Sequence, residues 1–555
     1  MTTASALRLH LGAVIAIVFF VGCAGPEAGT RAAPPSGPLT RAEATDYRET
    51  STHADVLAFL GQVEGEQIHL GVFGQSGEGR DLPFAVWGAP SADPEAVRQT
   101  GKTRVLVFAN IHAGEVAGKE AALMLLRDLA NGMHARWADS LVVMVAPNYN
   151  ADGNERVALD NRRLQFGPVG GMGQRPNAAG LDLNRDFMKL ASPEARALVG
   201  LLGDADPHVV VDLHTTNGTH MGYHLTYAPG LSPSTPAPID RALRDDWLPA
   251  ISEAILASDD LATWHYGNVP GAFGEAATAP RGWYSFSAQP RFGTNYVGLR
   301  GRYAILSEAY SYAPFDERVV VTKRFVEEIL NQAWARASEV RRHTADADAA
   351  SVVGEEIAVR ATWDPLPEPQ PVLLGAVDTV AHPTTGDPML ARRDVRTPET
   401  MPAYVRFAAS ETVTAPEAYV LRLGAGLDRV SDLLDAHGIA YEVDRSSRTL
   451  AESSVERFRV DSVRVAPRPF QGIRMQQAWG EWEAVPPSVM VDIEGTEMRS
   501  APGPALVIPV DQPLGRLVVA LFEPRSDDGL VAWAILGPEA LPEGGFAAIE
   551  RIPAR

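Results

Sequence analysis

A run of apolar residues, Val105–Ala109, leads to His112, and Glu115 follows three positions later. An imidazole and a carboxylate at the mouth of a hydrophobic strand form half of a site for a divalent metal ion. The pair alone decides little, because His and Glu fall at this spacing often by chance. A catalytic metal site also needs a third ligand, a base and a group that binds the substrate.

His214 offers the third ligand, because it follows a second apolar run, Val209–Leu213. The carboxyl ends of parallel strands open onto one edge of a sheet, so both histidines are expected at the same rim. Two histidines and one glutamate are a ligand set of catalytic zinc, with one coordination position left for water. A water in that position is acidified toward neutrality and becomes a usable nucleophile.

Glu308 follows the apolar run Tyr303–Leu306 and is expected at the same rim. A carboxylate in a dry cleft beside the metal can take a proton from water and pass it to a leaving amine. The alternative is a glutamate in solvent at the sheet edge, with no chemical role.

Two further segments offer cations. Asn184 and Arg185, in GLDLNRDF, combine an amide with a planar guanidinium fork that suits a carboxylate. Arg162 and Arg163, in DNRRLQF, form a second pair, and a cation there would stabilise the oxyanion of a tetrahedral intermediate.

Taken in order, the segments HAGE, NYNADG, DLNRDF, DLHTT and LSEAY resemble the motifs of the zinc metallocarboxypeptidases of the carboxypeptidase A and B type. GQSGEGRDL resembles the early G-x-S-x-E-G-R hairpin of that family, and Asn150 and Ala151 stand where its N-P-D-G turn has Asn and Pro. The resemblance covers about residues 46–340. It implies an α/β fold with a mixed, largely parallel central sheet flanked by helices. It also implies one Zn²⁺ ion and hydrolysis of peptides that end in a free carboxylate.

Carried over residue by residue, the resemblance implies that zinc is bound by His112, Glu115 and His214. Glu308 would be the general base and acid. Asp182 would orient a zinc-binding histidine, which fixes the ring and the tautomer of that ligand.

The same resemblance implies roles in substrate binding. Asn184 and Arg185 would hold the terminal carboxylate, and Arg163 is preferred over Arg162 as the cation at the oxyanion. The mobile tyrosine of the family has no clean counterpart, and Tyr284 and Tyr296 are the alternatives, with Tyr296 assigned to the substrate.

DLHTT is also similar to the aspartoacylase and succinylglutamate desuccinylase branch, which uses the same zinc set on acylated amino acids. Those proteins usually have HGNE, where this chain has HAGE, and are shorter, so the peptidase is preferred. A zinc amide hydrolase of that type, or a cell-wall peptide hydrolase, is the alternative. A non-catalytic binding protein on the same scaffold is disfavoured, because every ligand and base position is filled.

The elements that must carry these residues are short continuous apolar runs, which predict strands covered on both faces: Arg104–Ile111, Leu141–Ala146, Val209–Leu213 and Tyr303–Leu306. Helical patterns alternate with them at Lys119–Leu129, after the capping residue Ser192 and over Phe315–Arg341. The alternation predicts an α/β catalytic domain over residues 46–342.

Residues 343–555 are predicted to form a β-rich accessory region. Residues 343–356 are expected to be a linker, and one helix is expected at Gly426–His437. The strand-like runs are Tyr404–Phe407, Ala418–Leu423, Val460–Val465, Leu506–Pro509 and Leu517–Phe522.

The first residues indicate export. Residues 1–22 have the outline of a secretory signal peptide, and FVGC is similar to a bacterial lipobox that ends in Cys23, the single cysteine. We therefore expect lipidation at Cys23, a flexible tether over residues 23–45 and anchoring to a bacterial membrane, facing the periplasm or exterior. A net charge of −20 argues against a nucleic-acid partner.

Overall fold

The structure is a computed structural model that describes residues 36–271, 278–422, 427–444, 454–485 and 505–555. The predicted signal peptide, Cys23 and most of the predicted tether lie outside these residues. Residues 37–555 cluster into one unit, which includes both sides of the predicted boundary after residue 342. None of the helices in the described segments is long and apolar enough to cross a membrane.

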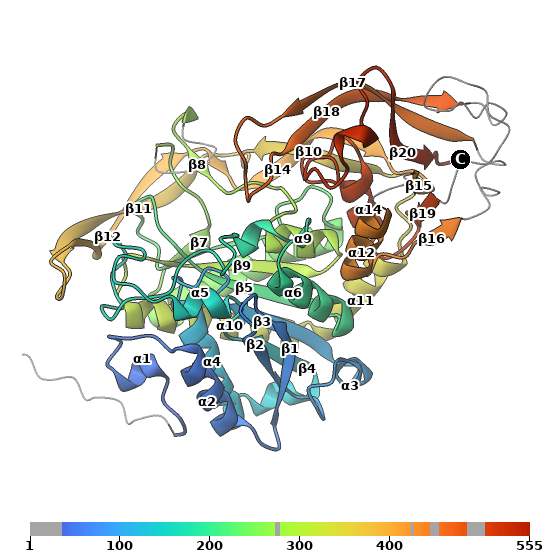
Figure 1. The fold of residues 1–555 in the computed structure, drawn as a ribbon. Coiled ribbons are helices and arrows are strands. Elements are labelled where there is room, and N and C mark those ends of the chain that lie inside the picture. Colours follow the sequence, from blue (N-terminus) through green and yellow to red (C-terminus); the bar gives the residue numbers. More distant parts are fainter. Residues whose placement is uncertain (1–35, 272–277, 423–426, 445–453, 486–504) are drawn as a thin grey trace, which may run out of the picture. The chain divides into compact units, whose positions relative to one another are not determined.

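An eight-stranded sheet lies at the centre of this unit (Figure 1). In spatial order its strands are β1 (Ile68–Gln75), β2 (Asp81–Trp87), β4 (Leu141–Ala146), β3 (Thr103–Ala109), β5 (Val209–Thr216), β9 (Tyr303–Tyr310), β6 (Leu225–Pro229) and β7 (Thr263–His265). Strands β4, β3, β5 and β9 are parallel to one another, whereas β1, β2 and β4 pair antiparallel, as do β9 and β6. The predicted mixed, largely parallel sheet is confirmed.

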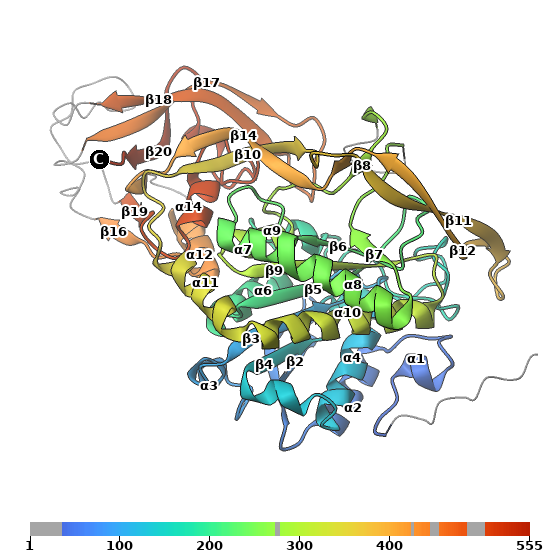
Figure 2. The same cartoon turned by 180° about the vertical axis from the view of Figure 1, so that it is seen from behind.

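Helices cover both faces of this sheet, as the apolar strands require. Val105 and Val107 of β3 belong to one core with helices α2 (His53–Val63), α4 (Ala117–Ala130), α8 (Leu248–Asp259) and α10 (Phe315–Ala335). Leu106 and Phe108 point to the opposite face and pack in a core with α6 (Pro193–Asp204). Figure 2 shows α8 and α10 lying across the first face.

Further α-helices occur in the described segments. They are α1 (Arg41–Ala44), α3 (Pro94–Gln99), α5 (Ala151–Glu155), α7 (Ala237–Arg241), α9 (Gly293–Leu299), α11 (Ala337–Ala349), α12 (Leu427–His437) and α14 (Gly515–Phe522). The predicted start of α6 is confirmed, because the Ser192 hydroxyl accepts a hydrogen bond from Ala195 N and Pro193 takes the first helical position.

The C-terminal region is rich in strands, as predicted. β10 (Glu356–Asp364) pairs with β14 (Arg406–Thr414), β11 (Gln370–Ala381) pairs with β12 (Pro388–Met401), and β13 (Ala403–Tyr404) pairs with β8 (Trp283–Tyr284). A six-stranded sheet contains β16 (Glu442–Asp444), β19 (Ala505–Pro509), β15 (Ala418–Leu421), β20 (Phe546–Ile552), β17 (Val455–Val465) and β18 (Gln476–Val485).

This region shares its apolar core with the central sheet. Leu434 of α12 and Leu517 of α14 belong to the same buried cluster as Phe108 of β3. The β11–β12 hairpin pairs with the loop that follows β5, where Gly222 N donates to Leu373 O at 2.8 Å. The central sheet and the C-terminal strands therefore depend on each other for burial.

Three local predictions were wrong. The run Leu517–Phe522 lies in helix α14 rather than in a strand, because all its residues are buried and a short apolar run has no period that separates the two. The helix predicted over Phe315–Arg341 breaks at Arg336, whose backbone is not helical. The predicted linker over 343–356 is helical as far as Ala349, because its alanines favour a helix.

Candidate metal centre

His112, Glu115 and His214 form a buried cluster that can hold a metal ion, and one ligand atom from each lies within 4.8 Å of the others. Both histidines turn Nδ1 toward the same carboxylate. His112 Nδ1 lies 3.0 Å from Glu115 Oε1, and His214 Nδ1 lies 2.9 Å from Glu115 Oε2. Two imidazole nitrogens and one carboxylate that converge in this way fit the ligand set of catalytic zinc.

Each histidine is backed by an aspartate on its other ring nitrogen. His112 Nε2 lies 3.0 Å from Asp182 Oδ1, and His214 Nε2 lies 2.9 Å from Asp212 Oδ2. The Asp182 contact is a hydrogen bond, which fixes the ring of His112 and would leave its Nδ1 for a metal ion, whereas the Asp212 contact is an ion pair without hydrogen-bond geometry. Asp182 takes the place expected from the sequence. Asp212 was missed, although it stands two positions before His214 and therefore points to the same face of β5.

Strands β5 and β9 run past their predicted ends, so His214 and Glu308 lie inside strands rather than after them. The two residues are register partners in the parallel β5–β9 pair. Glu308 Oε2 is buried and has no hydrogen-bond partner among the described residues. This places an unpaired carboxylate oxygen in the strand beside a metal ligand.

Burial and charge separate the pKa values of the two glutamates. Burial opposes ionisation of Glu115, but the charge of Arg162 and the neighbouring histidines outweigh it and hold its pKa well below the usual value. Burial raises the pKa of Glu308 to about 8, although His214 acts in the opposite direction. The ionised carboxylate suits a metal ligand, and the carboxyl group that titrates near neutrality suits proton transfer.

The arginines are arranged differently from the prediction. Arg162 forms an ion pair with Glu115, whereas Arg163 forms no hydrogen bond or ion pair within the described segments. Neighbouring side chains diverge here, and Arg162 has a positive φ of 52°. Of the two neighbouring arginines, it is therefore Arg162, and not the preferred Arg163, that contacts the cluster.

Arg175 is a second cation at the cluster, and it was missed. Its Nε and Nη2 donate to Asp182 Oδ2 at 3.0 and 2.7 Å, and its Nη1 lies 3.3 Å from His112 Nδ1. The side chain remains 44% exposed, so it can still meet a substrate. Only its place seven positions before Asp182, in GQRPNAAGLD, marks it in the sequence.

Asn184 and Arg185 lie in the short turn that Asp182 begins, since Asp182 Oδ1 accepts a hydrogen bond from Asn184 N at 3.0 Å. Asn184 Oδ1 accepts from Gly293 N at 2.9 Å. The Arg185 guanidinium lies over the Phe292 ring, 3.9 Å from its centroid. Burial lowers the pKa of Arg185 to about 10, which still leaves a cation at neutral pH. The structure therefore brings this pair beside the metal cluster.

Neither predicted tyrosine reaches the cluster. Tyr296 is fully buried, and its hydroxyl lies 2.8 Å from His437 Nδ1 of α12. Tyr284 stacks on Tyr404 with ring centroids 4.3 Å apart. The assignment of Tyr296 to the substrate is therefore corrected. Burial raises the pKa of Tyr266, a tyrosine that was not predicted, well above the usual value, and the charge of Glu308 adds to this shift.

Two other motifs support the loops that carry these groups. Ser76 Oγ and Arg80 Nη1, from the β1–β2 hairpin, both donate to Asp152 Oδ1 at 2.6 Å. Asn150 Nδ2, in the same NYNADG segment, donates to Ile111 O at 3.3 Å and to Arg175 O at 3.2 Å. The predicted hairpin and turn thus hold the backbone beside His112 and Arg175.

Residues 55–236 match the family model described as zinc carboxypeptidase. This part of the chain is similar to zinc carboxypeptidases. Carboxypeptidase 2 of Trichophyton rubrum is 33% identical over 144 residues, which are 25% of this chain and 23% of that protein. Carboxypeptidase D of Mus musculus is 31% identical over 155 residues, which are 23% of this chain and 11% of that protein.

The matched part of the chain thus spans about a quarter or less of the length of these relatives. Among solved structures, it is similar to a metallo-carboxypeptidase from Burkholderia cenocepacia, with a TM-score of 0.38 and 21% identity. That alignment covers 51% of this chain and 70% of the other. The family match contains the three metal-cluster residues and Asp182, and it ends before Glu308.

Proposed function

We propose that this chain is a zinc-dependent metallocarboxypeptidase that uses one Zn²⁺ ion to hydrolyse the C-terminal peptide bond of its substrate. One observation carries the proposal. The buried cluster of His112, Glu115 and His214 lies beside Glu308, whose Oε2 has no partner in the described part of the chain. A hydrolytic metal site needs both parts, a ligand set with an open position and a free base next to it.

The chemistry that a bound zinc ion supplies is polarisation of the scissile carbonyl and a more acidic water. Glu308 Oε2 takes the proton from the attacking water. The same carboxyl group then gives that proton to the nitrogen of the leaving amine, so that the group ends as it began. Burial raises the pKa of Glu308 to about 8, which supports a role that passes through the neutral carboxyl group.

Two cations are placed to stabilise negative charge on the carbonyl oxygen. Arg162 contacts Glu115, and Arg175 is held by Asp182, so both lie at the ligand cluster. Guanidinium groups fixed before the reaction stabilise developing charge without reorganisation. Arg175 is the more exposed of the two, with 44% of its side chain accessible against 17% for Arg162. It is therefore the better donor to a substrate.

Recognition of the terminal carboxylate is assigned to Asn184 and Arg185. The Phe292 ring covers one face of the Arg185 guanidinium and leaves the edge of its fork for a bidentate contact. Because Arg185 Nη1 also donates to Asn184 O at 2.8 Å, the fork is held in one orientation. A free C-terminus is the substrate group that matches it.

The test uses the full chain. Purified protein is expected to hold one zinc ion per chain and to cleave hippuryl dipeptides, and Glu308→Gln is expected to keep zinc while losing about 10²–10⁴-fold in turnover. The matched control substrate carries a C-terminal amide and should react poorly. N-acyl amino acids and muropeptides complete the panel. Cleavage of these alone would replace the carboxypeptidase by an amide hydrolase or a cell-wall peptide hydrolase.

We further propose that the protein is exported and anchored through a lipid on Cys23, because its single cysteine ends a lipobox-like segment. Metabolic labelling with a fatty acid should mark the wild-type protein and not Cys23→Ser. Equal membrane retention and no label in either protein would refute the anchor.

A further inference from the structure

The β17–β18 hairpin of the C-terminal region reaches the metal centre. Gln471 lies in the loop between these strands, and its side-chain Oε1 accepts a hydrogen bond from the backbone N–H of Asp182 at 2.8 Å. The two residues are 289 positions apart in the chain. Asp182 is the residue that holds both His112 and Arg175. The hydrogen bond therefore joins the C-terminal region to a group that orients the cluster.

The backbone of this loop tip is unusual for its sequence. Phe470 and Ile473 exchange backbone hydrogen bonds of 2.8 and 3.0 Å, and the two residues between them, Gln471 and Gly472, have φ values of 51° and 76°. Two-residue hairpin turns with positive φ at both positions strongly prefer Asn or Asp before Gly. Glutamine is a poorer choice for the turn itself, and its longer side chain is the part that reaches Asp182. A residue held against its backbone preference marks a place where function has to be considered.

Aromatic and ionic contacts fix the position of the tip. The Phe470 ring stacks on Trp533 at 6.0 Å, and the Arg291 guanidinium lies 5.3 Å from the Phe470 centroid and 5.0 Å from that of Trp533. Arg291 also pairs with the buried Asp528 at 2.7 Å. The loop tip thus packs against Arg291 of the catalytic region through charged and aromatic contacts.

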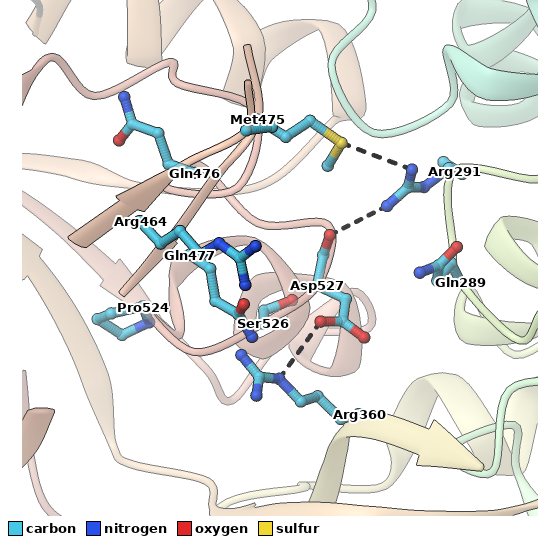
Figure 3. Close-up of a pocket in the computed structure, with 11 residues that line it drawn as sticks. Gln289, Arg291, Arg360, Arg464, Met475, Gln476, Gln477, Pro524, Ser526 and Asp527 are labelled. Carbon is cyan, nitrogen blue, oxygen red and sulfur yellow. Dashed lines mark hydrogen bonds and ion pairs between the residues drawn. The ribbon is translucent and has the colours of Figure 1, made fainter. Parts of the chain in front are cut away.

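Arg291 also lines a pocket between the catalytic region and the C-terminal region. Figure 3 shows Arg291 directed at Met475 and at the backbone oxygen of Asp527, with distances of 3.7 Å to the sulfur and 3.1 Å to the oxygen. Arg291 directly precedes Phe292, whose ring supports Arg185. The β17–β18 loop therefore contacts the Asp182–Arg185 turn directly through Gln471, and it contacts the segment that supports Arg185 through Arg291.

We propose that Gln471 is a positioning residue of the catalytic centre, which acts through Asp182 on His112 and Arg175. This inference rests on the proposed function. A neutral carbonyl is the right group for the role, because it satisfies the Asp182 N–H without adding a second negative charge beside that carboxylate. By this reasoning the C-terminal region supplies part of the active site rather than an independent accessory module.

Two variants separate the length of the Gln471 side chain from its capacity to accept a hydrogen bond. Gln471→Asn suits the turn better but is one methylene too short to reach Asp182, and Gln471→Met keeps the length but has no acceptor of comparable strength. Each loses a hydrogen bond of ordinary strength, so we expect about a fivefold fall in kcat and a rise of similar size in the zinc dissociation constant. KM should stay within about twofold, because Arg185 keeps its own support on Phe292. Gln471→Asn should retain the wild-type melting temperature, which excludes general unfolding.

The measurements are zinc competition against a chromogenic chelator, steady-state kinetics on a hippuryl dipeptide and thermal unfolding, all on the full chain. Both variants with unchanged kcat and unchanged zinc affinity would overturn the role of Gln471. A fall confined to Gln471→Met would also overturn it, because the methionine would then be acting through packing. A wild-type protein that neither binds zinc nor cleaves peptides would instead contradict the proposed function, so the two failures are distinct.

Discussion

Replacing Asp182 by asparagine is the sharpest single perturbation of this centre. The carboxylate accepts from four donors, namely His112 Nε2 at 3.0 Å, Arg175 Nε and Nη2 at 3.0 and 2.7 Å, and Asn184 N at 3.0 Å. Burial opposes its ionisation, but His112, Arg175 and Arg185 hold its pKa far below the usual range. Asp182→Asn removes the charge and turns an amide donor toward one of these donors.

The expected magnitude has two parts. Loss of the carboxylate behind a metal-binding histidine typically costs 10–100-fold in metal affinity or activity. Loss of a charge-assisted hydrogen bond to Arg175 costs about 1.5–3 kcal/mol, which lowers kcat/KM by a further factor of roughly 10–100. We therefore expect the zinc dissociation constant to rise about 10–100-fold, and kcat/KM at saturating zinc to fall by about 100-fold or more.

The matched control is Asp212→Asn, because Asp212 lies 2.9 Å from His214 Nε2 and, within the described residues, has no arginine partner. It should weaken zinc binding about tenfold and leave kcat/KM at saturating zinc within a few-fold of wild type. Zinc competition and kinetics at two zinc concentrations check both variants. Equal losses in the two variants, or an Asp182→Asn protein within threefold of wild type, would refute the assignment of a double role to Asp182.

Four further outcomes are expected. Arg185→Gln should lower kcat/KM for peptides with a free C-terminus about 10–100-fold, and it should lower kcat/KM for C-terminal amides less. If the ratio of kcat/KM for the two substrates does not change, Arg185 does not bind the terminal carboxylate. Zinc bound at 100 times its dissociation constant should stabilise the chelator-stripped protein by about 2.7 kcal/mol in unfolding experiments, and a melting temperature insensitive to zinc would speak against a native-state site. Burial lowers the pKa of His437 to about 3, so below about pH 6.5 the unfolded chain binds a proton at this residue that the folded chain does not bind. The free energy of unfolding should therefore decrease as the pH falls from about 6.5 toward 3, by up to about 1.4 kcal/mol per pH unit for this group. Urea titrations at several pH values should show a smaller decrease in His437→Gln. Asp528→Asn leaves the buried Arg291 without its ion pair and should lower the free energy of unfolding by about 3–5 kcal/mol. Asp527→Asn, at a half-exposed residue, should lower it by at most about 1 kcal/mol. Similar losses in both variants would refute the Arg291–Asp528 pair as the main support of Arg291.

The sequence predicted the metal cluster because its residues lie on the strongest pattern in the chain. His112 and His214 follow or end apolar runs, and the register of parallel strands brings such positions to one edge without further information. Glu308 was found for the same reason, although its strand proved longer than expected. The same kind of argument would have identified Asp212 as a neighbour of His214, because residues two positions apart in a strand lie on the same face.

The groups on loops were harder to predict, because no periodicity fixes the direction of a loop side chain. Arg162 and Arg163 are neighbours, and only the left-handed backbone at Arg162 decides which of them meets Glu115. Tyr296 sits at a favourable distance before Glu308 in sequence, but helix α9 turns it into the core toward His437. Gln471 has no chemical signature, and its contact is made across almost three hundred residues, so only the folded chain reveals it.

The order of the strands sets an order of assembly during synthesis. β9 lies between β5 and β6, although both precede it in the chain. β3 and β5 can pair as soon as the first 216 residues exist, and this pairing joins His112 to His214. Until β9 has been made, the apolar edge of β5 has no partner on that side. Along the chain the three residues of the metal cluster therefore come first, Glu308 arrives with β9 and Gln471 comes last, so the carboxyl group beside the cluster and its C-terminal contact are both added to a sheet whose cluster residues have already been made.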